Sequence, residues 1–227
     1  MAKRPISHAR GDVRKLQRVD PKRTLQYAEF EKLKAWAVGV IERCQATPAA
    51  VDRLAVRNAM IVIVLLGTAA RRFELCGFRC GDFYETNGEP FAYLIGKGKV
   101  EAEIPIADET WQYVQWWRSV KRANGEPVSK DATLFCGRNC EHLSVAQLNH
   151  IWDHVLALAG VPKREDVGVH AARHTAGMLF LRATGSIPKT AEFMRHSSDV
   201  VTSRFYRHVL PSDVRAGLNK VAGKKAL

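Results

Sequence analysis

The hydrophobic pattern of this chain changes period in its middle, and that change limits the fold more than any other feature. Apolar residues recur at helical spacing on both sides of residues 91–106. Within that segment, residues 91–95 and 101–106 form two short strand-like runs that flank Gly96-Lys97-Gly98-Lys99. Short strands joined by a glycine-rich connection predict a β-hairpin with Lys97 at or beside its turn. The expected fold class is mainly α with a small antiparallel β-sheet.

Capping residues and helix breakers predict the helix ends. Thr24 is expected to cap a first helix, and Thr47-Pro48 to begin a second one that continues through the apolar run from Ala59 to Leu66. Further helices are expected over residues 71–78, from Asp108, from Ser144 to Gly160, from His170 to Gly185, from Ser186 to Met194, around Tyr206 and from Ser212.

The positive charge of the chain lies mainly at its two ends. The chain has 35 Lys and Arg against 23 Asp and Glu, a formal net charge of +12. Residues 1–24 hold eight basic and two acidic residues, residues 182–227 hold nine and three, and 18 of each sign remain between them. A neutral body with basic ends is typical of proteins that bind nucleic acid, although basic tails also increase solubility.

Neither a membrane span nor a signal peptide is expected. No apolar run approaches the length of a membrane-spanning helix, and the basic N-terminus leads into no apolar segment. With five cysteines and no export signal, the chain is expected to be cytoplasmic and to keep its thiols reduced.

Two patterns allow a zinc interpretation. His170 and His174 have the spacing of two ligands on a helix, but Ala171 stands where a metallopeptidase needs a glutamate, and Arg173 lies between them. The other pattern combines Cys76-x3-Cys80 with Cys136-x3-Cys140-x-His142, yet Cys76 falls in an expected core helix, where a thiol acts as a small apolar group. Both zinc sites remain alternatives to an interpretation without metal.

An arginine, histidine and tyrosine cluster near the C-terminus carries the strongest chemical signal. His170-Ala-Ala-Arg173-His174-Thr175 is followed by His196-Ser-Ser and then by Tyr206. Arginine and protonated histidine bind the oxygens of a phosphodiester, and a tyrosine hydroxyl can attack its phosphorus. Arg71 at a helix start and Lys97 in a hairpin turn add further cations, and a helix N-terminus itself favours phosphate.

Together these segments resemble the catalytic domain of the tyrosine recombinases, the phage integrase family. The resemblance rests on Thr68-Ala-Ala-Arg71-Arg72-Phe-Glu74-Leu75, on Gly96-Lys97-Gly98-Lys99, and on the segments around Arg173, His196 and Tyr206, in the family's order. It implies site-specific recombination of double-stranded DNA through a 3′-phosphotyrosine, with no metal, ATP or other cofactor. It also implies a homodimer on one site and a homotetramer in synapsis, in a cytoplasmic, nucleoid-associated protein.

The resemblance also implies a role for each site residue. Arg71 and Arg173 would bind the non-bridging oxygens of the scissile phosphate, and His196 would donate a hydrogen bond to it. His170 would accept the proton of the tyrosine or bind the phosphate. Lys97 would protonate the leaving 5′-oxygen, and Tyr206 would be the nucleophile. Prepositioned cations stabilise the charge that grows on a transferring phosphoryl group.

Three positions depart from the family pattern. Tyr206 follows His196 at a spacing one residue longer than usual, which would turn a helical side chain by about 100°, so a loop extension is expected in residues 197–201. The alternative is a tyrosine that does not reach its phosphate. Arg195 stands where the family commonly has glycine, so either the turn differs or Arg195 contacts DNA. Arg72 remains an alternative to Arg71.

The expected organisation is a basic arm over residues 1–23, a catalytic domain over residues 24–210, and an amphipathic helix with a basic tail over residues 211–227. Relatives usually have a helical core-binding domain before the catalytic domain, so the chain is expected to be either a minimal recombinase or a piece of a longer protein. The terminal helix packs in its own subunit or docks on the next one. Two rival functions are a catalytically weakened DNA-binding relative and a metal-dependent nuclease.

Overall fold

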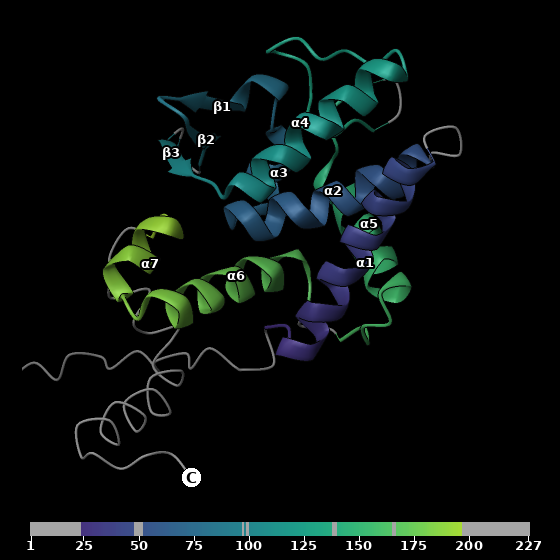
Figure 1. Cartoon of the computed structure of the whole chain (residues 1–227). Helices are drawn as coiled ribbons and strands as arrows, with labels where there is room; N and C mark the ends of the chain where they lie inside the picture. Colours follow the sequence, from purple (N-terminus) through teal and green to yellow (C-terminus); the bar gives the residue numbers. More distant parts are fainter. Residues whose placement is uncertain are drawn as a thin grey trace, which may run out of the picture.

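The computed structural model describes residues 24–47, 52–96, 98, 100–137, 140–164 and 167–196. They form mostly helices with one small antiparallel sheet (Figure 1), which confirms the expected fold class. The helices are α1 (Tyr27–Ala46), α2 (Arg53–Thr68), α3 (Arg72–Gly77), α4 (Asp108–Ala123), α5 (Val145–Leu158), α6 (Val169–Thr184) and α7 (Ile187–Phe193), with a 3₁₀ turn, η3 (Cys80–Asp82). The strands are β1 (Phe83–Thr86), β2 (Glu89–Ile95) and β3 (Glu101–Pro105).

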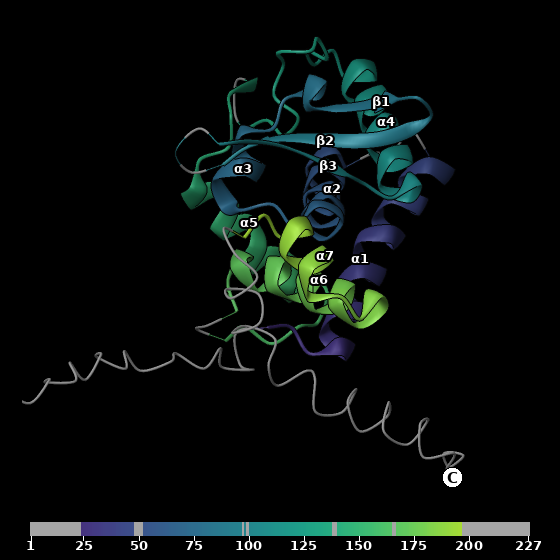
Figure 2. The same cartoon turned by 90° about the vertical axis from the view of Figure 1, so that its left-hand side faces the viewer.

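Helix α2 forms the centre of the domain. Every residue from Val56 to Leu65 is buried, including Arg57 and Asn58, and the run from Ala59 to Leu65 is apolar on all sides. It packs against α1, α4 and α6. The sheet lies at one end of the molecule and α6 and α7 at the other, with α2 between them (Figures 1 and 2). No helix in the described part of the chain is long and apolar enough to cross a membrane.

Two predicted helix starts were wrong. Helix α1 begins at Tyr27 after Gln26, not after Thr24, because Glu29 accepts a hydrogen bond from the Gln26 amide at 2.8 Å. Helix α2 begins at Arg53 rather than at Thr47-Pro48, because the Asp52 carboxylate accepts bonds from two amides of its first turn. The predicted Ser144 and Ser186 caps and the Gly185 end are confirmed.

The sheet contains one strand more than the sequence predicted. Strand β1 pairs with β2 through Asn87-Gly88, whose φ angles of 55° and 82° are those of a tight hairpin turn. Strand β2 pairs with β3 in the predicted hairpin, with Ile95 opposite Glu101, and the Gly96 amide donates to the Val100 carbonyl at 2.7 Å. Lys97, which the sequence predicts at or beside the turn of this hairpin, lies outside the described residues.

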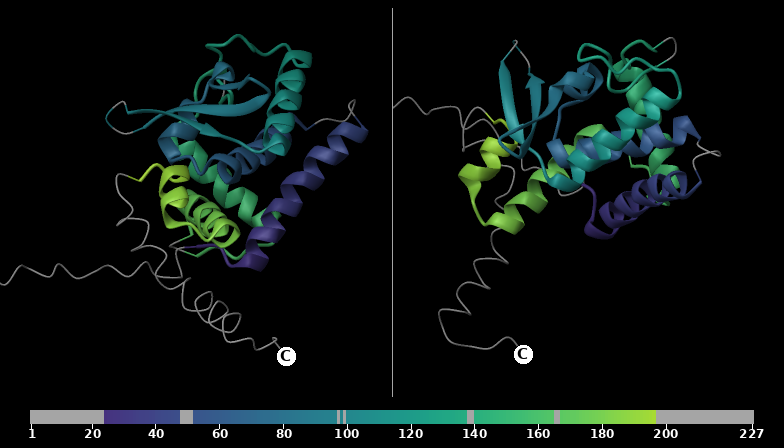
Figure 3. Two further views of the ribbon diagram at one scale, coloured as in Figure 1. Left: turned by 60° about the vertical axis from the view of Figure 1, so that its left-hand side comes forward. Right: turned by 45° about the horizontal axis from the view of Figure 1, so that its top comes forward.

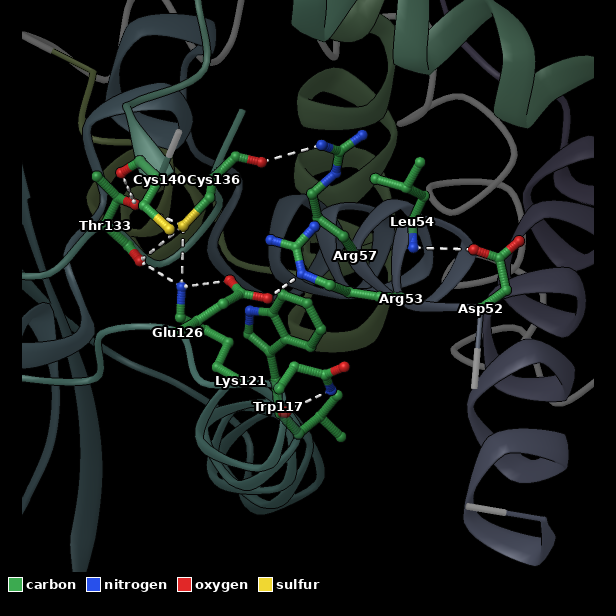
Figure 4. A network of polar contacts seen from close by, with 12 residues as sticks. Asp52, Arg53, Leu54, Arg57, Trp117, Lys121, Glu126, Thr133, Cys136 and Cys140 are labelled. Atoms are coloured by element: carbon green, nitrogen blue, oxygen red, sulfur yellow. Dashed lines mark hydrogen bonds and ion pairs between the residues drawn. The ribbon is translucent and has the colours of Figure 1, made fainter. Parts of the chain in front are cut away.

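A buried charge network joins α4 to the loop that follows it (Figure 4). The Lys121 side chain is fully buried, and its ammonium donates to the Thr133 carbonyl at 2.9 Å and contacts Cys136 Sγ at 3.1 Å. It also pairs with Glu126 at 3.2 Å, and the same carboxylate pairs with Arg53 of α2. Burial raises the pKa of Cys136, but Thr133 and Lys121 outweigh burial and lower it overall.

Candidate active site

Four segments that are far apart in the sequence meet around one cavity. They are the connection from α2 to α3, helix α5, the first turns of α6, and the turn that follows α7. Figure 3 shows α7 folded back against α6. The cavity has a volume of about 780 Å³ and is lined by Arg71, Arg72, Asn149, Trp152, Asp153, Gly168, Val169, His170, Ala171, Arg173, His174 and His196. The structure thus brings together four of the six predicted site residues, namely Arg71, His170, Arg173 and His196.

Arg71 is held by Glu74 at the start of α3. The Arg71 amide donates to Glu74 Oε2 at 2.6 Å, and its Nη1 donates to Glu74 Oε1 at 2.7 Å. Its Nη2 donates to the Arg195 carbonyl at 2.9 Å. The Glu74 side chain is only 2 % exposed. Burial alone would raise the pKa of Glu74, but Arg195 and Arg71 lower it overall, so the carboxylate stays ionised.

Arg173 connects α6 to the end of α2 and to the end of α7. Its side chain is buried, and its guanidinium donates to the carbonyls of Ala69 and Met194. Ala69 is the left-handed C-cap of α2, with a φ of 47°, and Met194 ends α7. Because both acceptors are backbone carbonyls, the position of Arg173 depends on how these two helices end.

The histidines of the cavity are surrounded by arginines. Burial, followed by Arg173 and Arg71, lowers the pKa of His196 to about 4. The pKa of His170 is lowered as well, mainly by burial and to a lesser extent by the nearby charges of Arg72, Arg173 and Arg71. Nearby cations disfavour a charged imidazole, so His196 is neutral near pH 7 and keeps one ring N–H as a donor.

The low pKa of His196 predicts a loss of stability in acid. The unfolded chain takes up a proton near the ordinary pKa of 6.5, whereas the folded chain does so only near 4. Stability is therefore unaffected by this group above pH 6.5 and falls as the pH drops from 6.5 toward 4. Thermal unfolding at pH 7, 6, 5 and 4 should show a smaller acid-dependent drop in Tm for His196→Asn than for the wild type. The exposed His154→Asn serves as control, and equal drops in all three proteins would contradict the prediction.

The two remaining predicted residues, Lys97 and Tyr206, lie outside the described residues. The neighbour of Lys97, however, is close to the cavity. A Cβ atom placed on Gly96 would lie 3.4 Å from Glu74 Oε1 and 3.8 Å from Arg71 Nη1. The base of the β2–β3 hairpin therefore lies against the Arg71–Glu74 pair.

Asn149 and Asp153 line the cavity but were not among the predicted site residues, whereas Arg72 was the alternative to Arg71. Arg71 and Arg72 both line the cavity, so both are placed to contact a ligand there. Asn149 and Asp153 come from α5, where their spacing of four residues places them on one helix face. Nothing in the sequence links α5 to the arginines, whereas the spacing from Arg71 to Glu74 is a recognisable capping-box signal.

Arg195 adopts a left-handed backbone, the conformation that favours glycine, with a φ of 49°. Its side chain is 10 % exposed and turns inward onto Glu74. The alternative in which Arg195 reaches out to DNA is wrong for this conformation, because the buried carboxylate attracts the guanidinium.

The cysteines lie apart from this cavity. All five are free thiols, and burial raises the pKa of Cys76 to about 11. Among the residues that the structure describes, no group of three or more His, Cys, Asp or Glu side chains is placed to hold a metal ion.

The arginines and histidines that line this cavity have the chemistry of a site for an anionic ligand. The model of the phage integrase family matches residues 40–212, and the chain therefore belongs to that family.

Among curated relatives, tyrosine recombinase XerC of Mycobacterium sp. (strain KMS) is 28 % identical over 166 residues, which cover 73 % of this chain and 53 % of the relative. XerC of Mycobacterium tuberculosis (strain ATCC 25177 / H37Ra) is also 28 % identical, with 54 % of its length covered. The chain thus spans about half the length of the curated relatives it matches.

Solved structures share the fold. The XerH site-specific recombinase, bound to a palindromic difH substrate in a post-cleavage complex, aligns with a TM-score of 0.67 and 20 % identity over 88 % of this chain and 52 % of that one. The lambda integrase dimer bound to a COC′ core site aligns with a TM-score of 0.55 and 17 % identity over 80 % of this chain and 47 % of that one.

Proposed function

We propose that this protein is a site-specific recombinase that cleaves and rejoins double-stranded DNA through a 3′-phosphotyrosine, without metal or ATP. The observation that carries the proposal is the convergence of Arg71, Arg173 and His196 on one cavity from segments far apart in the chain. Family membership and the likeness to recombinases solved with DNA support it.

In this proposal the cavity binds the scissile phosphate. Arg71 and Arg173 bind its non-bridging oxygens, and neutral His196 donates one hydrogen bond to it. These donors are fixed before the ligand arrives, so they can stabilise the charge that develops in the transition state without reorganising.

The covalent step exchanges one phosphoester for another. The Tyr206 oxygen bonds to phosphorus while the bond from phosphorus to the 5′-oxygen breaks. The phenolic proton passes to His170, whose lowered pKa leaves it neutral and able to accept. Lys97 gives a proton to the departing 5′-oxygen. The position of Gly96 beside Arg71 supports this role for Lys97.

The proposed organisation follows the distribution of charge. Residues 24–210 form the catalytic domain, residues 1–23 a basic arm that neutralises DNA phosphates, and residues 211–227 a helix with a basic tail. We further propose a homodimer on one DNA site and a homotetramer in synapsis, associated with the nucleoid in the cytoplasm. Phosphate contacts by the arm add affinity without choosing a sequence.

A nicked suicide substrate tests the function. Incubated with such DNA in EDTA, the wild type should form a covalent adduct that survives denaturation, and peptide mapping should locate the DNA on Tyr206. Tyr206→Phe removes only the nucleophilic hydroxyl and should trap none.

Three outcomes would overturn the proposal. DNA binding without an adduct identifies the catalytically silent relative, which the longer spacing before Tyr206 favours. EDTA-sensitive cleavage with two free ends identifies the metal-dependent nuclease. An adduct that forms equally in Tyr206→Phe places the nucleophile on another residue.

A further inference from the structure

We infer that Arg195 is a positioning residue that fixes Arg71 and His196 relative to each other. This inference deepens the proposed function and rests on it for the identity of the reaction. In the family that the sequence resembles, glycine commonly occupies this position, so an arginine here is a feature of this chain rather than of the common pattern.

The side chain of Arg195 links the turn after α7 to the α2–α3 connection by hydrogen bonds. Its Nη2 donates to Glu74 Oε2 at 2.8 Å and to the Ala69 carbonyl at 3.2 Å. Its Nη1 donates to the Thr68 carbonyl at 3.1 Å. A glycine makes none of these contacts, so the guanidinium adds an attachment between the turn before His196 and the end of α2.

The contacts of Arg195 and Arg71 form a closed ring through Glu74. Arg71 binds Glu74 Oε1 and the Arg195 carbonyl, while Arg195 binds Glu74 Oε2. Each arginine therefore fixes the other, although 124 positions separate them in the chain. A planar guanidinium with several donors in fixed directions suits this geometry, whereas a lysine ammonium is a point charge.

The ring bears directly on the cavity because His196 follows Arg195. The His196 amide donates to the Ala191 carbonyl at 2.9 Å, and this bond joins the backbone of the turn to α7. Arg195 holds the same turn to Thr68 and Ala69, next to Arg71. The left-handed φ of 49° is unfavourable for arginine, and in this conformation its side chain forms a buried ion pair with Glu74 at 2.8 Å.

The test compares Arg195→Gly with the wild type on the nicked substrate in single turnover. Glycine relieves the unfavourable φ, and Glu74 keeps its ion pair with Arg71, so the variant should fold, with its Tm as a check. We expect cleavage to slow by about ten- to a hundredfold, the effect of a small misplacement of reacting groups, while the Kd for DNA changes by less than about twofold. Arg195→Lys keeps the charge and should restore part of the rate. Lys189→Ala removes an exposed charge from α7 and should cleave like the wild type.

A second measurement does not depend on cleavage. NMR titration of the His196 ring should give a higher pKa in Arg195→Gly than in the wild type, because the cation is lost and the turn opens. If the wild type forms an adduct and Arg195→Gly cleaves equally fast, the role of Arg195 is overturned and the proposed function stands. If the wild type forms no adduct, the proposed function fails, and an unchanged His196 titration would overturn the Arg195 inference as well.

Discussion

Replacing Arg173 with alanine is expected to slow covalent DNA cleavage by about a thousandfold, the upper range for losing one preorganised donor at a developing oxyanion. The side chain is buried in the cavity wall, and its guanidinium is held by the carbonyls of Ala69 and Met194. The planar guanidinium offers its donors in fixed directions, and alanine removes all of them. The rate of adduct formation on a nicked substrate, at saturating protein, measures the effect.

Two controls separate chemistry from folding and from simple loss of charge. Arg173→Lys keeps the charge without the planar fork and should recover only part of the lost rate. Arg182→Ala removes an exposed arginine from the last turn of the same helix and should cleave at nearly the wild-type rate. An Arg173→Ala protein that is folded, as judged by its Tm, and cleaves within about threefold of the wild type would exclude Arg173 from phosphate binding.

Replacing Lys121 with alanine is expected to lower the free energy of unfolding by about 3–5 kcal/mol, the usual cost of removing one partner from a buried ion pair. The ammonium is fully buried and satisfies Glu126, the Thr133 carbonyl and Cys136. Alanine removes the ammonium from these groups, leaves Arg53 as the partner of Glu126, and opens a cavity where the lysine stem was. Urea denaturation followed by tryptophan fluorescence or circular dichroism measures the change.

Variants at and beside position 121 separate the loss of the buried ammonium from the loss of packing. Lys121→Met removes the charge but preserves most of the buried volume, so it should be less destabilising than Lys121→Ala. The difference in free energy of unfolding between the two variants measures the contribution of packing. Arg122→Ala alters the exposed neighbour and should change the free energy of unfolding by no more than about 0.5 kcal/mol. Equal stabilities of Lys121→Ala and Arg122→Ala would mean that the buried network does not stabilise the domain.

The fold could be predicted where hydrophobic period and local capping agree. The all-apolar stretch of α2, the Ser144 cap of α5 and the Gly185 end of α6 are each fixed by nearby residues. Strand β1 was missed because it is short and only Phe83 of its residues is buried, although Asn87-Gly88 is a strong hairpin signal. Helix α2 starts later than predicted because the Asp52 carboxylate accepts hydrogen bonds from two amides of its first turn.

The candidate site could be predicted in its residue types but not in its contacts. Arg173 and His170 share a helix face, so their proximity follows from spacing alone. The contact between Glu74 and Arg195 joins residues 121 positions apart, and it depends on how α7 folds back. No local pattern indicates whether an arginine in such a turn points outward to a ligand or inward to a buried carboxylate.

The carbonyl of Ala69 limits how this site can evolve. It accepts hydrogen bonds from both Arg173 and Arg195, and its orientation is set by the left-handed backbone that ends α2. A mutation that rotates this one peptide plane would displace two guanidiniums in the same step. Substitutions at positions 69, 173 and 195 are therefore expected to be non-additive, so a change that is tolerated alone at one of them can be harmful in combination with another.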